Sequence, residues 1–337
     1  MTDTTRAVTQ DEDGIRLDRW LRRHVPGLGQ AQVQKWCRTG QVRVDGGRVE
    51  ASLRLASGQN VRVPPVPVAR PQPVATGTTI TPNPVTRHEL EDLILYRDDA
   101  LIVFNKPAGL AVQGGPGIHR HLDGMLESLR DPGFHEGARP RLVHRLDRDT
   151  SGVLVVGRTP GVAAKLAAAF RGRDVHKTYW AVVSGRPEPE AGRIGLALVR
   201  VGKGAGALSA VAQKGDEDAA RALTEYRTLE QAGRKLSWME LRPITGRTHQ
   251  LRVHCVALGA PILGDLKYHE PDQNGAFNAI VDGLSNRLHL HARTLELPHP
   301  EGGLLVVEAP LPPHMQATFK TLGFEARPPM QPKRTRA

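Results

Sequence analysis

The sequence predicts an α+β protein with two domains, for three reasons. Strand-like segments follow one another directly at several places, as at residues 93–96 and 101–104, and this spacing indicates antiparallel hairpins. Helical patterns occur between strands without the regular alternation that produces βαβ units, so an all-parallel sheet is not expected. Residues 64–84 contain seven prolines, which exclude a helix or a sheet interior and separate a small N-terminal region from a large C-terminal one.

The composition indicates a protein that binds a polyanion. The formal net charge of the chain is +11, and nucleic acid is the preferred partner because no amphipathic membrane anchor stands out. No apolar run approaches the roughly 18 residues of a membrane span, and the polar start lacks the apolar core of a secretory signal, so we expect a cytoplasmic protein. Cys37 and Cys255 lie in separate helical patterns, so neither a disulfide nor a zinc site is expected.

The N-terminal region has the pattern of a small basic domain over residues 14–64, behind a disordered start at residues 1–13. Apolar residues at helical spacing predict helices at 17–25 and 30–38, and alternation around Asp45-Gly46 predicts a hairpin. The domain carries ten Arg and Lys against three Asp and Glu. Such charge repels itself unless phosphates are present, which favours an RNA-binding surface over a merely solvated basic face. The candidate RNA-binding cations are Arg16, Arg19, Arg22, Arg23, Lys35, Arg38 and Arg43.

The remaining boundaries follow from composition. Residues 65–89 are expected to form an extended linker, residues 90–325 a second domain, and residues 326–337 a disordered basic tail. Further predicted strands of the second domain are 153–156, 177–183, 222–229, 236–241 and 304–309, and its predicted helices are 160–170, 247–258 and 312–322.

One stretch of the second domain concentrates charge between apolar segments. Residues 141–152 carry Asp147 among several arginines, and the apolar run 153–156 follows directly. Side chains clamped in this way lie at the rim of a core, where fixed neighbours set the reactivity of a carboxylate. The competing interpretation is an ordinary ion-pair or N-cap turn, in which Asp147 has only a structural role.

Other segments offer groups that could act with this carboxylate. Lys177 and Tyr179 share one face of a predicted strand because side chains alternate along strands. Arg247 starts a predicted helix, and helix N-termini attract anions. His289 and His291 could ligate a metal, but no third ligand is near, so hydrogen-bonded histidines are expected and no metal is.

Several reaction types are disfavoured by the motifs that are missing. The glycine-rich residues 113–117 lack the Gly-Lys-Ser/Thr ending and the following helix of a phosphate loop. No Ser-His-Asp order is present. The pattern that is left suits acid–base or nucleophilic carboxylate chemistry on an anionic, nucleotide-like substrate.

The motifs resemble those of the RluA family of pseudouridine synthases. Residues 144–152 (HRLDRDTSG) resemble its aspartate motif, residues 245–254 (TGRTHQLRVH) its second motif, and Lys177-x-Tyr179 its intermediate one. Residues 16–21 and 41–46 resemble an S4 domain, a small RNA-binding fold, and this combination is most similar to the RluC type, which acts on large-subunit rRNA. The resemblance implies a mixed, mostly antiparallel sheet of about eight strands with flanking helices, and an S4-like domain in front.

The resemblance also implies the reaction and the roles of residues. Uridine in RNA, most simply 23S rRNA or a large-subunit precursor, is isomerised to pseudouridine without a cofactor or metal by a monomeric enzyme. Asp147 is the essential carboxylate, either as nucleophile at C1′ or as base in a glycal route. Arg247 pairs with Asp147, and Tyr179 contacts the uracil. The implied substrate-binding residues are Arg145, His144, Lys177, Leu251, Thr248 and His249.

Two alternatives stay open at this point. A non-catalytic rRNA-binding factor could use the same fold, although it would have no use for Asp147, Tyr179 and Arg247 together. A tRNA-directed enzyme of the same family is the other, disfavoured because the basic domain and long linker suggest a larger substrate.

Overall fold

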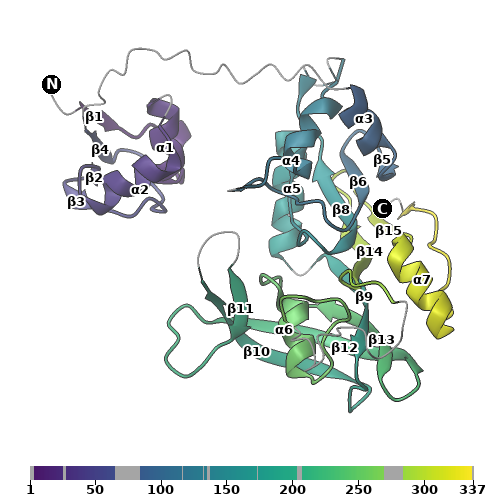
Figure 1. Cartoon of the computed structure of the whole chain (residues 1–337). Helices are drawn as coiled ribbons and strands as arrows, with labels where there is room; N and C mark the ends of the chain where they lie inside the picture. Colours follow the sequence, from purple (N-terminus) through teal and green to yellow (C-terminus); the bar gives the residue numbers. More distant parts are fainter. Residues whose placement is uncertain are drawn as a thin grey trace. The chain divides into compact units, whose positions relative to one another are not determined.

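The computed structural model describes residues 4–25, 28–64, 84–115, 117–131, 133–134, 137–172, 174–202, 207–268 and 284–335. The chain divides into two compact units, residues 1–79 and 80–337. Figure 1 shows the helices and strands of both units. In the described part of the chain, no helix is both long and apolar enough to span a membrane.

The first unit combines two helices with a small antiparallel sheet. Its elements are β1 (Thr4–Ala7), a 3-10 turn (Gln10–Glu12), α1 (Leu17–His24), α2 (Gln30–Arg38), β2 (Arg43–Val44), β3 (Gly47–Arg48) and β4 (Asn60–Val63). The strand order is β1-β4-β2-β3. Trp20, Val33 and Val61 belong to its buried core, which joins the apolar face of both helices to the sheet.

The prediction of a disordered N-terminus is wrong for β1. Thr4 to Ala7 pair antiparallel with Val63 to Asn60, and the amide of Val8 donates to the carbonyl of Gln59 at 2.8 Å. The cause is the edge of β4, whose unpaired backbone groups are satisfied by this polar segment.

The second unit is built on one large sheet. Its helices are α3 (Pro84–Glu91), α4 (Leu122–Met125), η2 (Leu126–Leu129), α5 (Pro160–Arg171), α6 (Gln250–Ala257) and α7 (Pro313–Leu322). Its strands are β5 (Ile94–Arg97), β6 (Leu101–Lys106), β7 (Arg141–Leu142), β8 (Ser151–Gly157), β9 (His176–Ser184), β10 (Ala191–Val201), β11 (Leu208–Val211), β12 (Ala220–Ala232), β13 (Leu236–Pro243), β14 (Leu290–Pro298), β15 (Leu304–Glu308) and β16 (Lys333–Thr335).

The topology confirms the predicted α+β class with a mixed, mostly antiparallel sheet. The order of the main path is β11-β10-β12-β13-β9-β14-β8-β6-β5, and the one parallel pair among the described strands is β14 with β8. The sheet has 12 strands, more than the eight or so that the family resemblance implied, because β7, β15 and β16 add to it outside the main path.

Both faces of the sheet are covered, as the alternation along β9 shows. Ala181 and Val183 pack in the core that includes α6, whereas Trp180 and Val182 pack in the core that includes α7. Figure 1 shows α6 lying over β10 and β12. Because side chains alternate, Lys177 and Tyr179 fall on the same face as Ala181, on the side of α6.

Three further predictions about segments need correction. Most of the expected linker lies outside the described residues, but residues 84–89 form part of α3. The expected disordered tail contains β16, which pairs with β15 because that strand presents an open edge. The helix predicted from Arg247 begins three residues later, at Gln250.

Candidate active site

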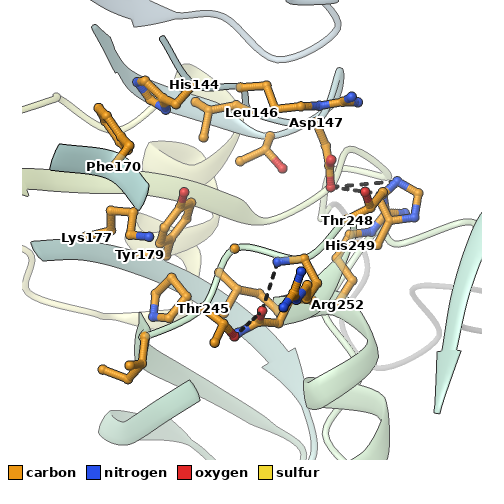
Figure 2. Close-up of a pocket in the computed structure, with 18 of the residues that line it drawn as sticks. His144, Leu146, Asp147, Phe170, Lys177, Tyr179, Thr245, Thr248, His249 and Arg252 are labelled. Atoms are coloured by element: carbon orange, nitrogen blue, oxygen red, sulfur yellow. Dashed lines mark hydrogen bonds and ion pairs between the residues drawn. The ribbon is translucent and has the colours of Figure 1, made fainter. Parts of the chain in front are cut away.

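A cavity of about 570 Å³ opens where the loop around Asp147, strand β9, the turn 244–249 and helix α6 meet. Figure 2 shows Asp147 with His249 and Arg252 toward one side of this cavity, and Lys177, Tyr179 and Phe170 toward the other. The charged stretch singled out in the sequence is therefore the wall of a concave site.

Asp147 faces two nitrogen groups across short distances. Its Oδ2 lies 3.8 Å from Nε2 of His249 and 3.9 Å from Nη1 of Arg252. The Asp147 side chain keeps 18% of its surface exposed, so a ligand in the cavity can reach it. An ordinary ion-pair turn would engage this carboxylate with its own loop, whereas here it faces groups about 100 residues further along the chain.

Lys106 holds the loop that carries Asp147 through hydrogen bonds to backbone carbonyls. It is fully buried, and its ammonium donates to the carbonyls of Pro107 (2.9 Å), Leu110 (2.8 Å) and Arg148 (2.9 Å). Burial lowers the pKa of Lys106 to about 7, against the opposing effects of Asp149 and Asp147. Since an ammonium has three donors, all of them are used, and together they tie the backbone beside Asp147 to residues 107–110.

Arg252 is the cation that the fold places beside Asp147. It is 3% exposed, and its Nε donates to Oδ2 of Asp265 at 2.7 Å while Nη2 contacts the other oxygen. Burial acts to lower the pKa of Arg252, but the hydrogen bond and charge of Asp265, with the charge of Asp147, raise it. The guanidinium is thus a fixed positive charge aimed by a bidentate carboxylate.

The predicted pairing of Arg247 with Asp147 is wrong. Arg247 is exposed, and its Nε donates to the carbonyl of Arg221 at 3.3 Å. The reason is the helix start: the side chain of Gln250 accepts the amide of Arg247 at 3.0 Å, which leaves Arg247 in a turn before α6. The sequence signal that could have identified Arg252 is a charged residue between the apolar Leu251 and Val253, on a helix face that must be buried.

Lys177 and Tyr179, which share one face of β9, line the opposite wall of the cavity. Both are half-buried. Burial lowers the pKa of Lys177, and burial together with the charge of Asp147 raises the pKa of Tyr179. Tyr179 is therefore a neutral phenol at physiological pH, with its hydroxyl directed into the cavity (Figure 2).

His144, which the resemblance implied as a substrate-binding residue, also makes contacts that hold its own loop in place. Its Nε2 accepts the amide of Val155 at 2.9 Å, and its ring stacks on Phe170 with centroids 4.2 Å apart. Burial and the charge of Lys177 lower the pKa of His144 to about 3, so the imidazole is neutral.

The other predicted substrate-binding residues also line the cavity. Arg145 and Thr248 are exposed, whereas Leu251 is buried and joins the core under α6. The carbonyl of Thr248 accepts the hydroxyl of Ser209 at 2.7 Å, which ties the turn to β11.

The histidines of the His-x-His pair are core residues. His289 and His291 are fully buried, and they hydrogen-bond the hydroxyls of Thr318 (2.8 Å) and Ser151 (2.9 Å). Within the residues that the structure describes, no group of three metal-ligating side chains comes together.

Several candidate RNA-binding cations of the first unit have hydrogen-bond or ion-pair partners within the protein. Arg16 pairs with Asp18 at 2.9 Å, Arg22 donates to the carbonyl of Asp18, and Arg43 donates to the carbonyls of Gly40 and Gly46. Arg16 and Arg38 line a second concavity of about 600 Å³. Arg48, which the sequence analysis did not single out, lines it too.

Comparison with known proteins gives consistent results. Residues 100–257 match the family model described as RNA pseudouridylate synthase. The chain is 34% identical to ribosomal large subunit pseudouridine synthase C of Escherichia coli, over 90% of this chain and 92% of that protein. It is 35% identical to the mitochondrial RNA pseudouridine synthase 4 of Arabidopsis thaliana, over 95% and 82%. The structure of human RNA pseudouridylate synthase domain containing 4 superposes with a TM-score of 0.60 at 32% identity, over 72% of this chain and 97% of that one.

Proposed function

The chain belongs to the RluA-type family of RNA pseudouridine synthases, and on this premise we propose that it isomerises specific uridines of large-subunit rRNA through Asp147. The observation that carries the proposal is the carboxylate of Asp147, partly exposed in a cavity and faced by the buried cation Arg252 at 3.9 Å.

The chemistry matches what this cavity offers. In the isomerisation, the N1–C1′ bond of uridine breaks, the uracil turns while it is held, and C5 bonds to C1′ as the proton on C5 leaves. No electrons are exchanged with a second reactant. Asp147 either attacks C1′ or removes a proton in a glycal route, and in both routes the Arg252 guanidinium, 3.9 Å away, helps to position the carboxylate.

We assign Tyr179 and Lys177 to contacts with the uracil ring of the target uridine. The uracil is held against the ring of Tyr179, whose neutral hydroxyl can exchange a proton with it. The uracil that leaves C1′ carries negative charge, and Lys177 is a cation on the same wall of the cavity.

The target uridine has to leave its stack to reach Asp147, which requires about a few kcal/mol. Arg145 is exposed at the cavity and carries a guanidinium that can stack in the vacated place. His144 fixes the loop behind it through the amide of Val155.

The choice of rRNA rests on the relatives and on charge. Relatives named for the ribosomal large subunit align with 90% or more of this chain in several bacteria. The first unit is assigned as an S4-like RNA-binding domain because it joins two helices to a small sheet and carries the basic excess. We further propose that the enzyme is cytoplasmic, monomeric and independent of metal.

Tritium release from [5-³H]uridine-labelled RNA tests the function, because the C5 proton is lost as pseudouridine forms. We expect release from 23S rRNA, little from tRNA, and none above background for Asp147→Asn. Asp149→Asn is the matched control: it changes a neighbouring carboxylate that pairs with Arg148 on the surface. Absence of release from any RNA would support a binding factor, and release from tRNA alone would reassign the substrate.

A further inference from the structure

Tyr268 joins the active site to strand β11 through its hydroxyl. The amide of Ser209 donates to the Tyr268 oxygen at 2.8 Å, and the same oxygen lies 2.7 Å from Nδ1 of His249. The two rings meet edge to face, with centroids 5.4 Å apart. Nε2, the opposite nitrogen of the imidazole, faces Oδ2 of Asp147 at 3.8 Å.

This arrangement selects one form of His249. Burial lowers the pKa of His249 despite the opposing charge of Asp147, so a neutral imidazole is expected. Because the Tyr268 oxygen already accepts the Ser209 amide, its own proton is available for Nδ1. The proton of the neutral ring is then on Nε2, where it points toward Asp147.

The backbone of His249 gives an independent reason for external support. Its φ is +53°, in the left-handed region that residues with a side chain adopt at a cost of about 1 kcal/mol or more. A residue held there needs contacts that fix it. Tyr268 supplies one through the side chain, and the Ser209 hydroxyl supplies another through the carbonyl of Thr248.

The same short segment also aims the second group that faces Asp147. Asp265, three residues before Tyr268, holds Arg252 in a bidentate pair, and the Arg252 guanidinium lies 4.9 Å from the centre of the Tyr268 ring. Both nitrogen groups near the reacting carboxylate are therefore positioned from residues 265–268.

We propose that Tyr268 is a positioning residue for the isomerisation, which fixes the imidazole of His249 with its Nε2–H toward Asp147. This inference rests on the proposed function. The 3.8 Å separation is longer than a hydrogen bond, so the contact acts as an electrostatic one until the bound substrate draws the groups together. Tyr268 itself does not touch the reacting atoms.

The test is a double-mutant cycle of Tyr268→Phe and His249→Ala, measured as single-turnover tritium release from 23S rRNA over a range of enzyme concentrations. Tyr226→Phe is the matched control, since it removes a tyrosine hydroxyl that donates to the carbonyl of Pro189 away from the cavity. We expect Tyr268→Phe to lower the maximal rate about tenfold while the half-saturating concentration stays within about twofold. In the His249→Ala background the same change should have no further effect.

The outcomes separate the two claims. An inactive wild-type protein would contradict the proposed function. With an active wild type, the inference is overturned by an unchanged maximal rate in Tyr268→Phe, by an effect on half-saturation alone, or by rate losses that add in the double variant. Thermal unfolding of both phenylalanine variants completes the test. A melting temperature of Tyr268→Phe far below that of Tyr226→Phe, with rates that recover on cooling, would show a structural role and also overturn it.

Discussion

Replacement of Arg252 by Met is the sharpest test of the site, because Arg247 was the residue that the sequence favoured. The Arg252 guanidinium lies 3.9 Å from Asp147, and at an effective dielectric constant of about 20 this separation corresponds to about 4 kcal/mol. If the whole of that interaction serves to position the carboxylate in the transition state, its loss lowers the rate by about three orders of magnitude. Arg247→Met should lower it less than about tenfold, because Arg247 is exposed and bonds one backbone carbonyl.

The design has to separate rate from stability. Arg252→Met leaves Asp265, which is 1% exposed, as a buried charge without its partner, and such a loss destabilises by about 3–5 kcal/mol. Arg252→Met combined with Asp265→Asn removes the buried charge and should recover much of the free energy of unfolding without recovering the rate. Arg252→Lys keeps a positive charge but loses the bidentate geometry, so an intermediate rate is expected.

Single-turnover tritium release at saturating enzyme gives the rate, and urea denaturation gives the free energy of unfolding. The reasoning is refuted if Arg247→Met is slower than the folded Arg252 variants. It is equally refuted if the double variant is as fast as wild type.

Three other predictions concern binding and stability. The double substitution Arg19→Gln and Arg38→Gln should reduce the slope of log affinity for rRNA against log salt concentration by about 1.4–1.8, without changing the rate at saturation. An unchanged slope in filter binding would argue against RNA binding by these cations of the first unit. The substitution Gly152→Ala should lower the free energy of unfolding by more than about 3 kcal/mol, because φ of Gly152 is +111° and an added Cβ would lie 2.2 Å from the carbonyl oxygen of Ala292. A urea denaturation midpoint equal to that of the wild type would contradict this. Burial lowers the pKa of His289 from 6.5 to about 4. As the pH falls, His289 is therefore protonated in the unfolded chain before it is protonated in the folded one, and the free energy of unfolding decreases between pH 6.5 and 4, by about 2 kcal/mol at pH 5. His289→Gln should remove that part of the pH dependence in denaturation curves, and an unaltered dependence would exclude His289 as its source.

The sequence by itself determined the features that depend on neighbouring residues. Apolar alternation located the hairpin of β5 and β6, and helical spacing located α5. The Thr159 hydroxyl caps that helix by accepting a hydrogen bond from the amide of Val162 at 3.3 Å. The apolar segments that flank the charged stretch around Asp147 likewise indicated a carboxylate at the rim of a core. These signals are local, because propensity, capping and alternation act over a few residues.

Only the tertiary structure decided which groups meet Asp147. Helix α6 starts at Gln250, whose side chain bonds the carbonyl of Leu223 at 3.0 Å and the hydroxyl of Thr224 at 2.9 Å, and this distant anchor turns Arg252 inward. Lys106 and Tyr268 reach the site from 41 residues before Asp147 and 121 residues after it. No local pattern specifies such contacts, since they arise when strands far apart in sequence pair and bring their ends to one cavity.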